Sequence, residues 1–136
     1  MKAVLDTNVV ASGLFFGGVP RRILDPLSQG AFELILSPAI LEEYQQVYAR
    51  LASRHPELQS RQPVLELLAY GTLLPDAEVE DTVTRDPDDD KFLLCARSAE
   101  AIVVSGDRDL LDASGWACVQ VITPRGFLDR LTAQGT

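Results

Sequence analysis

Short apolar segments that alternate with helical patterns constrain the fold of this chain more than any other feature. Apolar and β-branched runs at 2–5, 32–36, 101–105 and 119–122 predict four strands. The most regular helical pattern lies between them and runs from 38 to about 53. Further helices are expected from about 9, from 20, over 63–70, after 86, near 110 and from 124. Short buried strands separated by helices are typical of an α/β fold with a parallel sheet.

The length of 136 residues fits a single domain, residues 1–136, with a full hydrophobic core. Hydrophobic residues make up 46% of the chain and charged residues 24%, which excludes a disordered composition. No apolar run approaches the ~20 residues of a membrane span, and the first run reaches Asp6 too soon for a secretion signal. We therefore expect a cytoplasmic protein with no membrane partner. Cys95 and Cys118 lie in apolar stretches and are expected to be buried, reduced thiols.

Acidic residues follow two of the predicted strands. Asp6 comes directly after the strand at 2–5, and Asp107 follows the strand at 101–105 after one glycine. Right-handed crossovers place the carboxyl ends of parallel strands at one edge of the sheet, where such folds bind ligands. We therefore expect Asp6 and Asp107 to lie at the same edge.

Helical phasing at ~100° per residue adds further acids to this edge. The apolar stripe of the helix at 38–53 consists of Ile40, Tyr44, Val47 and Leu51. Glu43 lies ~60° from the centre of that stripe, whereas Glu42 points nearly opposite. The apolar stripe of the helix after 86 consists of Phe92, Cys95, Ala96 and Ala99. Asp88 and Asp89 flank this stripe, and Asp90 is expected to face solvent. Phasing alone does not separate Asp88 from Asp89.

Several carboxylates at one edge need a counter-charge, because like charges in a cleft of low dielectric repel each other. The acids so placed offer only oxygen ligands, which suit Mg²⁺ or Mn²⁺, and the absence of a Cys/His cluster disfavours zinc. Carboxylate-bound Mg²⁺ ions ~3.5–4 Å apart typically serve in-line displacement at phosphorus. Since His55 is the only histidine, a Ser-His-Asp or Cys-His triad is nearly excluded. The pattern indicates phosphodiester chemistry at a metal site.

Each acid also has a purely structural interpretation. Asp6 would cap the helix that follows it, Glu43 would reach solvent, and Asp89 would be the N3 acid of a capping box. Asp107 and Asp109 would be residues of a turn. All of these interpretations must hold together at phased positions, so the set supports a metal site more strongly than any single member does.

The overall charge of −8 argues against simple electrostatic binding of nucleic acid. Eight acids lie between residues 76 and 90 against a single base, Arg85. Bases elsewhere are candidates to hold the phosphates that flank a scissile bond. With Arg85 they form the set Arg21, Arg22, Arg50, Arg54, Lys91, Arg97 and Arg108.

Four segments, in order along the chain, resemble the signature blocks of PIN domains. They are 4–8 (VLDTN), 37–44 (SPAILEEY), 86–93 (DPDDDKFL) and 104–111 (VSGDRDLL). The segment at 122–128 (ITPRGFL) is also similar to the close of the bacterial PIN subgroup that includes toxins of toxin–antitoxin pairs, the VapC-like proteins. Any one block is weak evidence, but four at compatible spacing are specific.

The resemblance implies a three-layer α/β/α sandwich around a parallel sheet, and Mg²⁺- or Mn²⁺-dependent cleavage of RNA. By motif match, the catalytic, metal-binding acids are Asp6, Glu43, Asp89 and Asp107. The same match makes Asn8 and Ser105 polar residues of the site, and Asp109 an accessory acid. The family spacing selects Asp89 over Asp88. The resemblance also implies a toxin role, with a cognate antitoxin that inserts a segment into the acidic cleft, and a homodimer.

Two other functions fit parts of this pattern. A Mg²⁺-dependent phosphotransfer domain also places carboxylates at strand ends, but the phosphatase pattern needs a second acid where Asn8 stands. The receiver pattern needs a lysine late in the chain, and Lys2 and Lys91 are the only lysines. The other alternative is a non-catalytic PIN-like module that serves only for contacts. Binding of Mn²⁺ without a phosphoryl donor, together with RNA cleavage, separates a nuclease from both.

Overall fold

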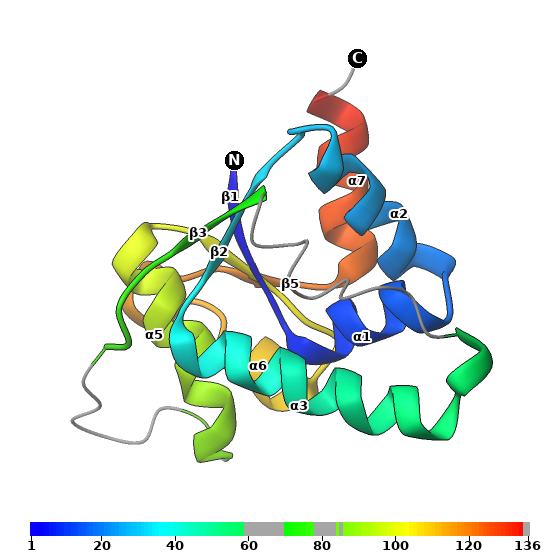
Figure 1. Cartoon of the computed structure of the whole chain (residues 1–136). Coiled ribbons are helices and arrows are strands. Elements are labelled where there is room, and N and C mark those ends of the chain that lie inside the picture. The colour runs from blue at the N-terminus through cyan, green and yellow to red at the C-terminus, as the bar shows by residue number, and fades with distance from the viewer. Residues whose placement is uncertain (59–69, 78–83, 85, 135–136) are drawn as a thin grey trace.

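Five strands form a single sheet at the centre of the molecule (Figure 1). The computed structural model describes residues 1–58, 70–77, 84 and 86–134. The strands are β1 (Lys2–Leu5), β2 (Glu33–Leu36), β3 (Gly71–Leu73), β4 (Ile102–Val104) and β5 (Val121–Ile122). Their order is β3-β2-β1-β4-β5, and each neighbouring pair is parallel. The predicted α/β fold with a parallel sheet is therefore confirmed.

Helices cover both faces of this sheet. They are α1 (Thr7–Phe15), α2 (Gly18–Ser28), α3 (Pro38–Arg54), α5 (Asp90–Ala99), α6 (Arg108–Asp112) and α7 (Pro124–Gln134). Short 3₁₀ turns are η1 (Pro56–Leu58), η3 (Pro87–Asp89) and η4 (Trp116–Cys118). In Figure 1, α2 and α7 lie together on one side of the sheet, α5 lies on the other, and α3 crosses the end at which β1 and β2 finish. No helix in the described ranges is long and apolar enough to cross a membrane.

Local sequence explains where the helices of the site begin. Ser37 caps α3 with its hydroxyl, which accepts a hydrogen bond from the Ile40 backbone at 3.4 Å, and proline follows as the first helical residue. Asp86 caps η3 in the same way, since its carboxylate accepts from the Asp88 backbone at 3.0 Å. Both helix starts therefore follow the predicted cap-and-proline pattern.

The core consists of side chains from the strands and from the inner faces of the helices. Its largest fully buried members are Phe92, Phe127, Leu5, Ile23, Leu27, Leu34, Ile35, Leu36, Ile40, Leu93, Leu110 and Val4. Burying a side chain of this size contributes ~1.5–3 kcal/mol, before the entropy of ordering it is subtracted. The predicted inner stripe of α5 (Phe92, Cys95, Ala96 and Ala99) is buried as expected.

The strand β3 was not expected from the sequence. Gly71, expected to end a helix, is instead the first residue of β3, and the helix predicted over 63–70 lies almost wholly outside the described residues. A three-residue edge strand whose only large apolar side chain, Leu73, is 51% exposed has no apolar pattern to identify it. Its pairing with β2 supplies what its sequence lacks.

Two predictions about side-chain burial were wrong. Cys95 is buried as expected, but Cys118 is exposed, and both thiols are free. Cys118 lies in η4, outside the sheet, where its backbone takes a left-handed conformation (φ 63°). Asp90, expected to face solvent, is only 2% exposed. Its Oδ1 accepts hydrogen bonds from the Thr84 backbone at 2.8 Å and the Thr84 hydroxyl at 2.7 Å. The 3₁₀ turn before α5 changes the helical phase, and the chain around Thr84 covers Asp90.

We expect Asp90→Ala to lower the free energy of unfolding by ~1–3 kcal/mol, because it leaves the buried Thr84 N–H without its acceptor, whereas the Thr84 hydroxyl can still donate to the Asp86 carbonyl. The matched control is Asp88→Ala, whose side chain is exposed and whose loss should change stability by less than ~0.5 kcal/mol. Urea unfolding monitored by circular dichroism measures both. Equal destabilisation by the two variants would contradict the assignment of Asp90 to a structural role.

Candidate active site

Asp6 lies at the carboxyl end of β1, where it is only 5% exposed. The parallel pairing of β1 with β4 continues through the hydrogen bond from the Asp6 backbone to the Val104 carbonyl, at 2.9 Å. This pairing brings Ser105, the residue after β4, to the Asp6 side chain. The Ser105 hydroxyl donates to Asp6 Oδ2 at 2.7 Å and accepts from the Asp107 backbone at 2.9 Å. One buried serine thus connects two of the predicted acids.

Three carboxylates form a tight group beside this pair. Asp89, Asp107 and Asp109 each bring one oxygen to within 4.8 Å of the other two; we refer to these three residues as the carboxylate cluster. Asp107 is the N-cap of α6, and its Oδ1 accepts from the Asp109 backbone at 3.0 Å. The capping turn therefore holds two of the three carboxylates next to each other, and η3 brings the third from a distant part of the sequence.

Asp89 has an unusual environment within the carboxylate cluster. Its Oδ2 is buried, and it has no hydrogen-bond partner among the described residues. Burial raises the pKa of Asp89 to about 7, assisted by a hydrogen bond with Asp107 and by the charges of Asp107, Asp86 and Asp6. A buried, unpaired carboxylate oxygen is costly, and a bound cation would remove that cost. Oxygen ligands grouped in this way fit a divalent cation such as Mg²⁺ or Mn²⁺.

The pKa of Asp6 is also raised. Burial is the main cause, and the negative charges of Asp107 and Glu43 act in the same direction. Hydrogen bonds from the Ser105 hydroxyl and from the Asn8 backbone lower the pKa without cancelling the rise. The negative charge of Asp107 thus contributes to the raised pKa of both Asp6 and Asp89.

Glu43 lies on the inner side of α3 and points to the same edge of the sheet. Its Oε1 is 2.7 Å from the Lys91 ammonium, and its Oε2 accepts a hydrogen bond from the Thr7 hydroxyl. Glu42 is exposed and contacts Gln46 at 3.3 Å, one turn along the same helix. The predicted inward orientation of Glu43 rather than Glu42 is therefore confirmed.

Tyr44, beside Glu43, holds α3 against the end of β1. Its buried hydroxyl donates to the Leu5 carbonyl, the last of the strand before Asp6. Burial and the nearby charges of Asp6 and Glu43 raise the pKa of Tyr44 well above its ordinary value, so the phenol keeps the proton it donates. This bond sets the distance between the two elements that carry Asp6 and Glu43.

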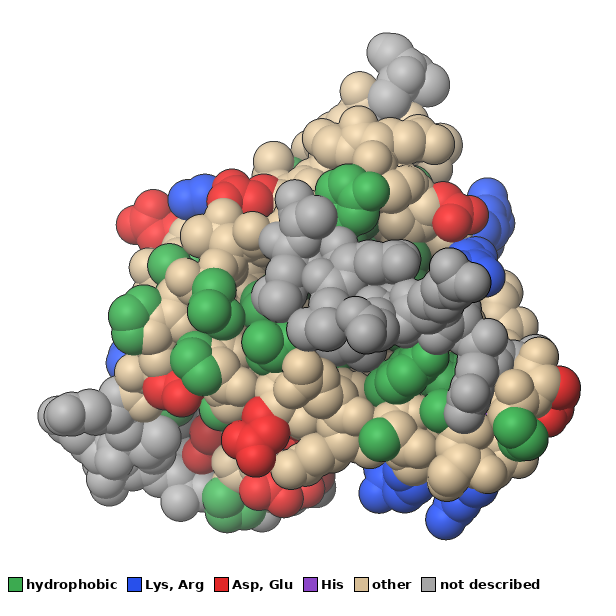
Figure 2. Space-filling view, in the orientation of Figure 1, with side chains coloured by type: hydrophobic (Ala, Val, Ile, Leu, Met, Phe, Trp, Pro, Cys, Tyr) green, Lys and Arg blue, Asp and Glu red, His purple; other side chains and the backbone are tan. Residues whose placement is uncertain are grey.

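The structure therefore brings Asp6, Ser105, Asp89, Asp107 and Asp109 to one place, with Glu43 beside Asp6 and tied to Lys91. Asn8 lies in the first turn of α1 with an exposed side chain. The catalytic and metal-binding roles of these residues remain predictions. Figure 2 shows red, acidic side chains gathered at the lower margin of the molecule, where α3 and α5 begin in Figure 1.

Sequence reasoning did not give a site role to Thr7 or Tyr44. It placed Lys91 only among the basic residues that are candidates to hold the phosphates of a substrate. Thr7 and Tyr44 both lie within segments that resemble PIN-domain blocks, but Tyr44 was assigned to the apolar stripe of its helix. Lys91 follows the acids at 88–90 directly, and this position is the signal that would have suggested a counter-ion. The sequence does not indicate that Lys91 and Glu43, which are 48 residues apart, form an ion pair.

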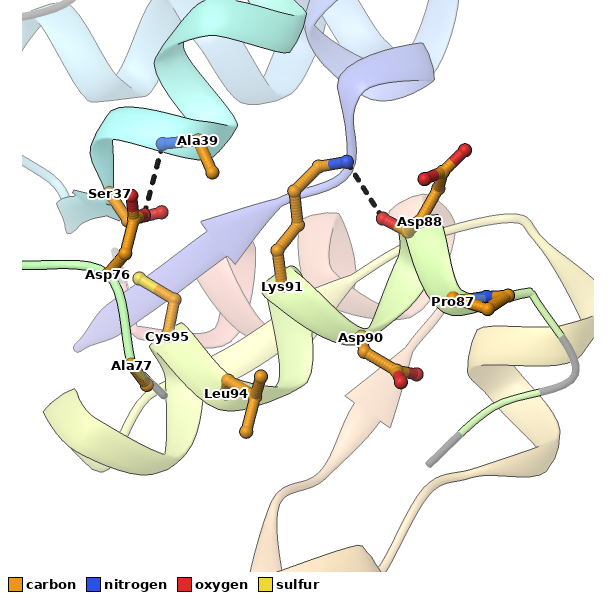
Figure 3. A pocket seen from close by; sticks show the side chains of 10 residues that line it. All are labelled: Ser37, Ala39, Asp76, Ala77, Pro87, Asp88, Asp90, Lys91, Leu94 and Cys95. Carbon is orange, nitrogen blue, oxygen red and sulfur yellow. Dashed lines mark hydrogen bonds between the residues drawn. The ribbon is translucent and has the colours of Figure 1, made fainter. Parts of the chain in front are cut away.

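A pocket of about 310 Å³ adjoins the site on the Lys91 side (Figure 3). It is lined by Ser37, Ala39, Asp76, Ala77, Pro87, Asp88, Asp90, Lys91, Leu94 and Cys95. Asp76 accepts a hydrogen bond from the Ala39 backbone at 3.1 Å, at the start of α3. Burial and the charge of Asp76 raise the pKa of Cys95 to about 11, which keeps that thiol protonated. Lys91 thus contributes to both the pocket and the acidic site.

Comparison with known proteins shows similarity in sequence and in fold. A model of the PIN-domain family matches residues 2–109. An uncharacterized protein of Methanocaldococcus jannaschii, MJ1680, is 30% identical over 114 residues, which are 82% of this chain and 74% of the relative. The crystal structure of PAE2754 from Pyrobaculum aerophilum covers 98% of this chain and 100% of that chain, with a TM-score of 0.58 and 15% identity. The last likeness concerns the fold alone.

We expect the metal-free protein to become less stable as the pH rises from about 5 to about 8. The pKa of Asp89 is about 7 in the folded chain, against an ordinary value of 3.8, so the folded chain holds more protons than the unfolded chain in this window. Stability is therefore greatest on the acidic side and is lost as the pH rises through about 7. Urea unfolding in EDTA at both pH values measures this loss.

Asp89→Asn, which mimics the protonated form, should show a smaller loss of stability than the wild type over this pH range. Glu42→Gln, a neutralising change on an exposed side chain outside the site, should keep the wild-type loss. If Asp89→Asn loses as much stability as the wild type, Asp89 is not the group that titrates.

Proposed function

This chain belongs to the PIN-domain family, and on that premise we propose that it is a ribonuclease that hydrolyses RNA phosphodiester bonds with Mg²⁺ or Mn²⁺. PIN domains are generally nucleases, which supports a hydrolase acting on nucleic acid. The observation that carries the proposal is the carboxylate cluster, with oxygens within 4.8 Å of one another and one buried oxygen that has no partner in the described part of the chain. Such an arrangement is costly for a protein that uses this fold for contacts alone.

The residues that would hold the metal are Asp89, Asp107 and Asp109. Asp6 is linked to Asp107 through the Ser105 hydroxyl. When bound, the metal would supply positive charge that lowers the pKa of an attacking water and stabilises the leaving oxygen. The chain prepares this arrangement itself. Ser105 donates a hydrogen bond to Asp6 Oδ2 and accepts one from the Asp107 backbone N–H. The residues that carry the two carboxylates are therefore held in position before any ligand binds.

The charge distribution around the site supports a polyanionic substrate despite the net charge of −8. Lys91 places an ammonium beside the acids. Figure 2 shows blue side chains on the same lower margin, farther right, below the last turns of α3. The exposed basic residues of α3 are Arg50 and Arg54. Basic side chains in these positions suit the phosphates that flank a scissile bond. Such side chains contact the sugar-phosphate backbone of the nucleic acid rather than its nucleobases.

We expect Asp6→Asn to reduce RNA cleavage by about 100-fold or more while the protein still folds, because it removes a charge that orients the site. A mixed pool of single-stranded and structured RNA, incubated with Mn²⁺, Mg²⁺ or EDTA, measures cleavage and its metal dependence. Circular dichroism confirms folding of the variant. Undiminished cleavage by Asp6→Asn, or cleavage in EDTA, would show that this site does not carry the reaction.

A matched pair of variants on α3 tests the part of Glu43. Glu43→Gln should reduce cleavage, since it removes the partner of Lys91, whereas Glu42→Gln should leave cleavage unchanged, because its side chain is exposed and contacts only a neighbour on its own helix. The same RNA pool serves as substrate. A large loss with Glu42→Gln would mean that the orientation of α3 is different from the one described.

The motif resemblance also leads us to propose that the chain is the toxin of a toxin–antitoxin pair and that it acts as a homodimer. Induced expression of the wild type in a bacterial host should then arrest growth, because cellular RNA is cleaved. Asp6→Asn should not arrest growth, and coexpression of a small protein encoded beside this chain should relieve the arrest. Normal growth at confirmed expression of an RNA-cleaving wild type would contradict the toxin role.

A further inference from the structure

Glu43 differs from the carboxylate cluster in that groups of this chain already occupy both of its oxygens. Oε1 is 2.7 Å from Lys91 Nζ, and Oε2 accepts from the Thr7 hydroxyl. In the carboxylate cluster, by contrast, Asp89 Oδ2 is buried with no partner among the described residues. The acidic site therefore has two unlike sides: at Glu43 both carboxylate oxygens have partners within this chain, whereas Asp89 keeps one buried oxygen with no partner among the described residues.

Lys91 is fixed in place by more than its ion pair. Its ammonium donates to the Asp88 carbonyl at 2.8 Å and lies 5.3 Å from the centroid of the Phe92 ring, and the side chain is only 22% exposed. Figure 3 shows Lys91 extending from α5 away from Asp90 and Leu94, with its ammonium bonded to Asp88. A lysine held in this way has already lost its rotamer freedom, so its charge has a defined position.

We propose that Lys91 is a built-in cation on the Glu43 side of the site, so that the protein takes one divalent cation per chain, at the carboxylate cluster. The inference rests on the proposed metal-dependent function and specifies how its positive charge is divided. A second divalent cation at Glu43 would have to replace both Lys91 and Thr7. The displaced ammonium would remain close by, because Lys91 follows Asp89 by only two residues, and like charges would repel.

The ammonium also has the chemistry that a second cation supplies in phosphodiester hydrolysis. In two-metal sites the second ion stabilises charge on the phosphate and the leaving oxygen. A lysine ammonium has three donors, and Glu43 and the Asp88 carbonyl account for two of them. The third can donate to a phosphate oxygen, for which lysine is a well-suited point charge. Lys91 thus serves as a positioning residue for Glu43 and as a positive charge for the substrate.

The test is the number of Mn²⁺ ions bound per chain in the absence of RNA, measured by isothermal titration calorimetry and by electron paramagnetic resonance of the free ion. We expect one ion for the wild type. Lys91→Met should bind a second ion, because it frees Glu43 at the edge of an acidic site. Lys2→Met is the matched control: it removes the only other lysine, an exposed residue at the opposite end of β1, and should still bind one ion.

The single variants Glu43→Gln and Asp107→Asn keep the test decisive if Lys91→Met folds poorly. Glu43→Gln should still bind one ion, with affinity within about tenfold of wild type, whereas Asp107→Asn should lose it. The double variant Lys91→Met/Glu43→Gln should return to one ion if the second ion binds at Glu43. Two ions in the wild type, one ion in a folded Lys91→Met, or loss of the ion in Glu43→Gln would each overturn the proposal.

The outcomes also separate this inference from the proposed function. Two ions bound by a wild type that cleaves RNA would refute the role of Lys91 and leave the nuclease intact. One ion bound by a wild type that cleaves no RNA, with the expected gain in Lys91→Met, would support the role of Lys91 and refute the nuclease. Absence of any bound Mn²⁺ would refute both.

Discussion

Repulsion among carboxylates at the carboxyl edge of the sheet is the constraint on which the rest of this structure depends. β1 and β4 are parallel neighbours, so Asp6 and Asp107 are brought together by the backbone itself. Glu43 from α3 and Asp89 at the start of α5 add to the same edge. The raised pKa values of Asp6 and Asp89 are the direct expression of this crowding and of burial. A fold that concentrates acids in this way must supply compensating positive charge or protons.

The chain supplies part of that compensation in three different forms. The Ser105 hydroxyl donates a hydrogen bond that stabilises the negative charge of Asp6, and it fixes Asp6 relative to Asp107. The ammonium of Lys91 cancels the charge of Glu43. A proton on Asp89, whose pKa is about 7, removes a further charge near neutral pH. Asp89 Oδ2, in the carboxylate cluster, still has no partner among the described residues, which is the physical reason to place a divalent cation there rather than at Glu43.

Residues at the ends of strands and helices carry this geometry. Tyr44 is fully in the core yet bonds the Leu5 carbonyl, so the helix that carries Glu43 is anchored to the strand that ends at Asp6. The capping of α6 by Asp107 likewise ties one of the proposed metal ligands to the start of a helix. Groups held by the backbone need little reorganisation when a ligand binds, and this favours stabilisation of charge that develops during a reaction.

The sequence by itself determined the α/β class, four of the five strands and the inward orientation of Glu43, because strand and helix periodicities are local properties of the chain. It also indicated that Asp6 and Asp107 share an edge, since strand ends in a parallel sheet obey a general rule. Only the tertiary structure decided the rest. The strand β3 exists through its pairing with β2, Asp90 is buried because Thr84 covers it, and Lys91 faces Glu43 across 48 residues. These depend on contacts between distant segments, which no local pattern of residues encodes.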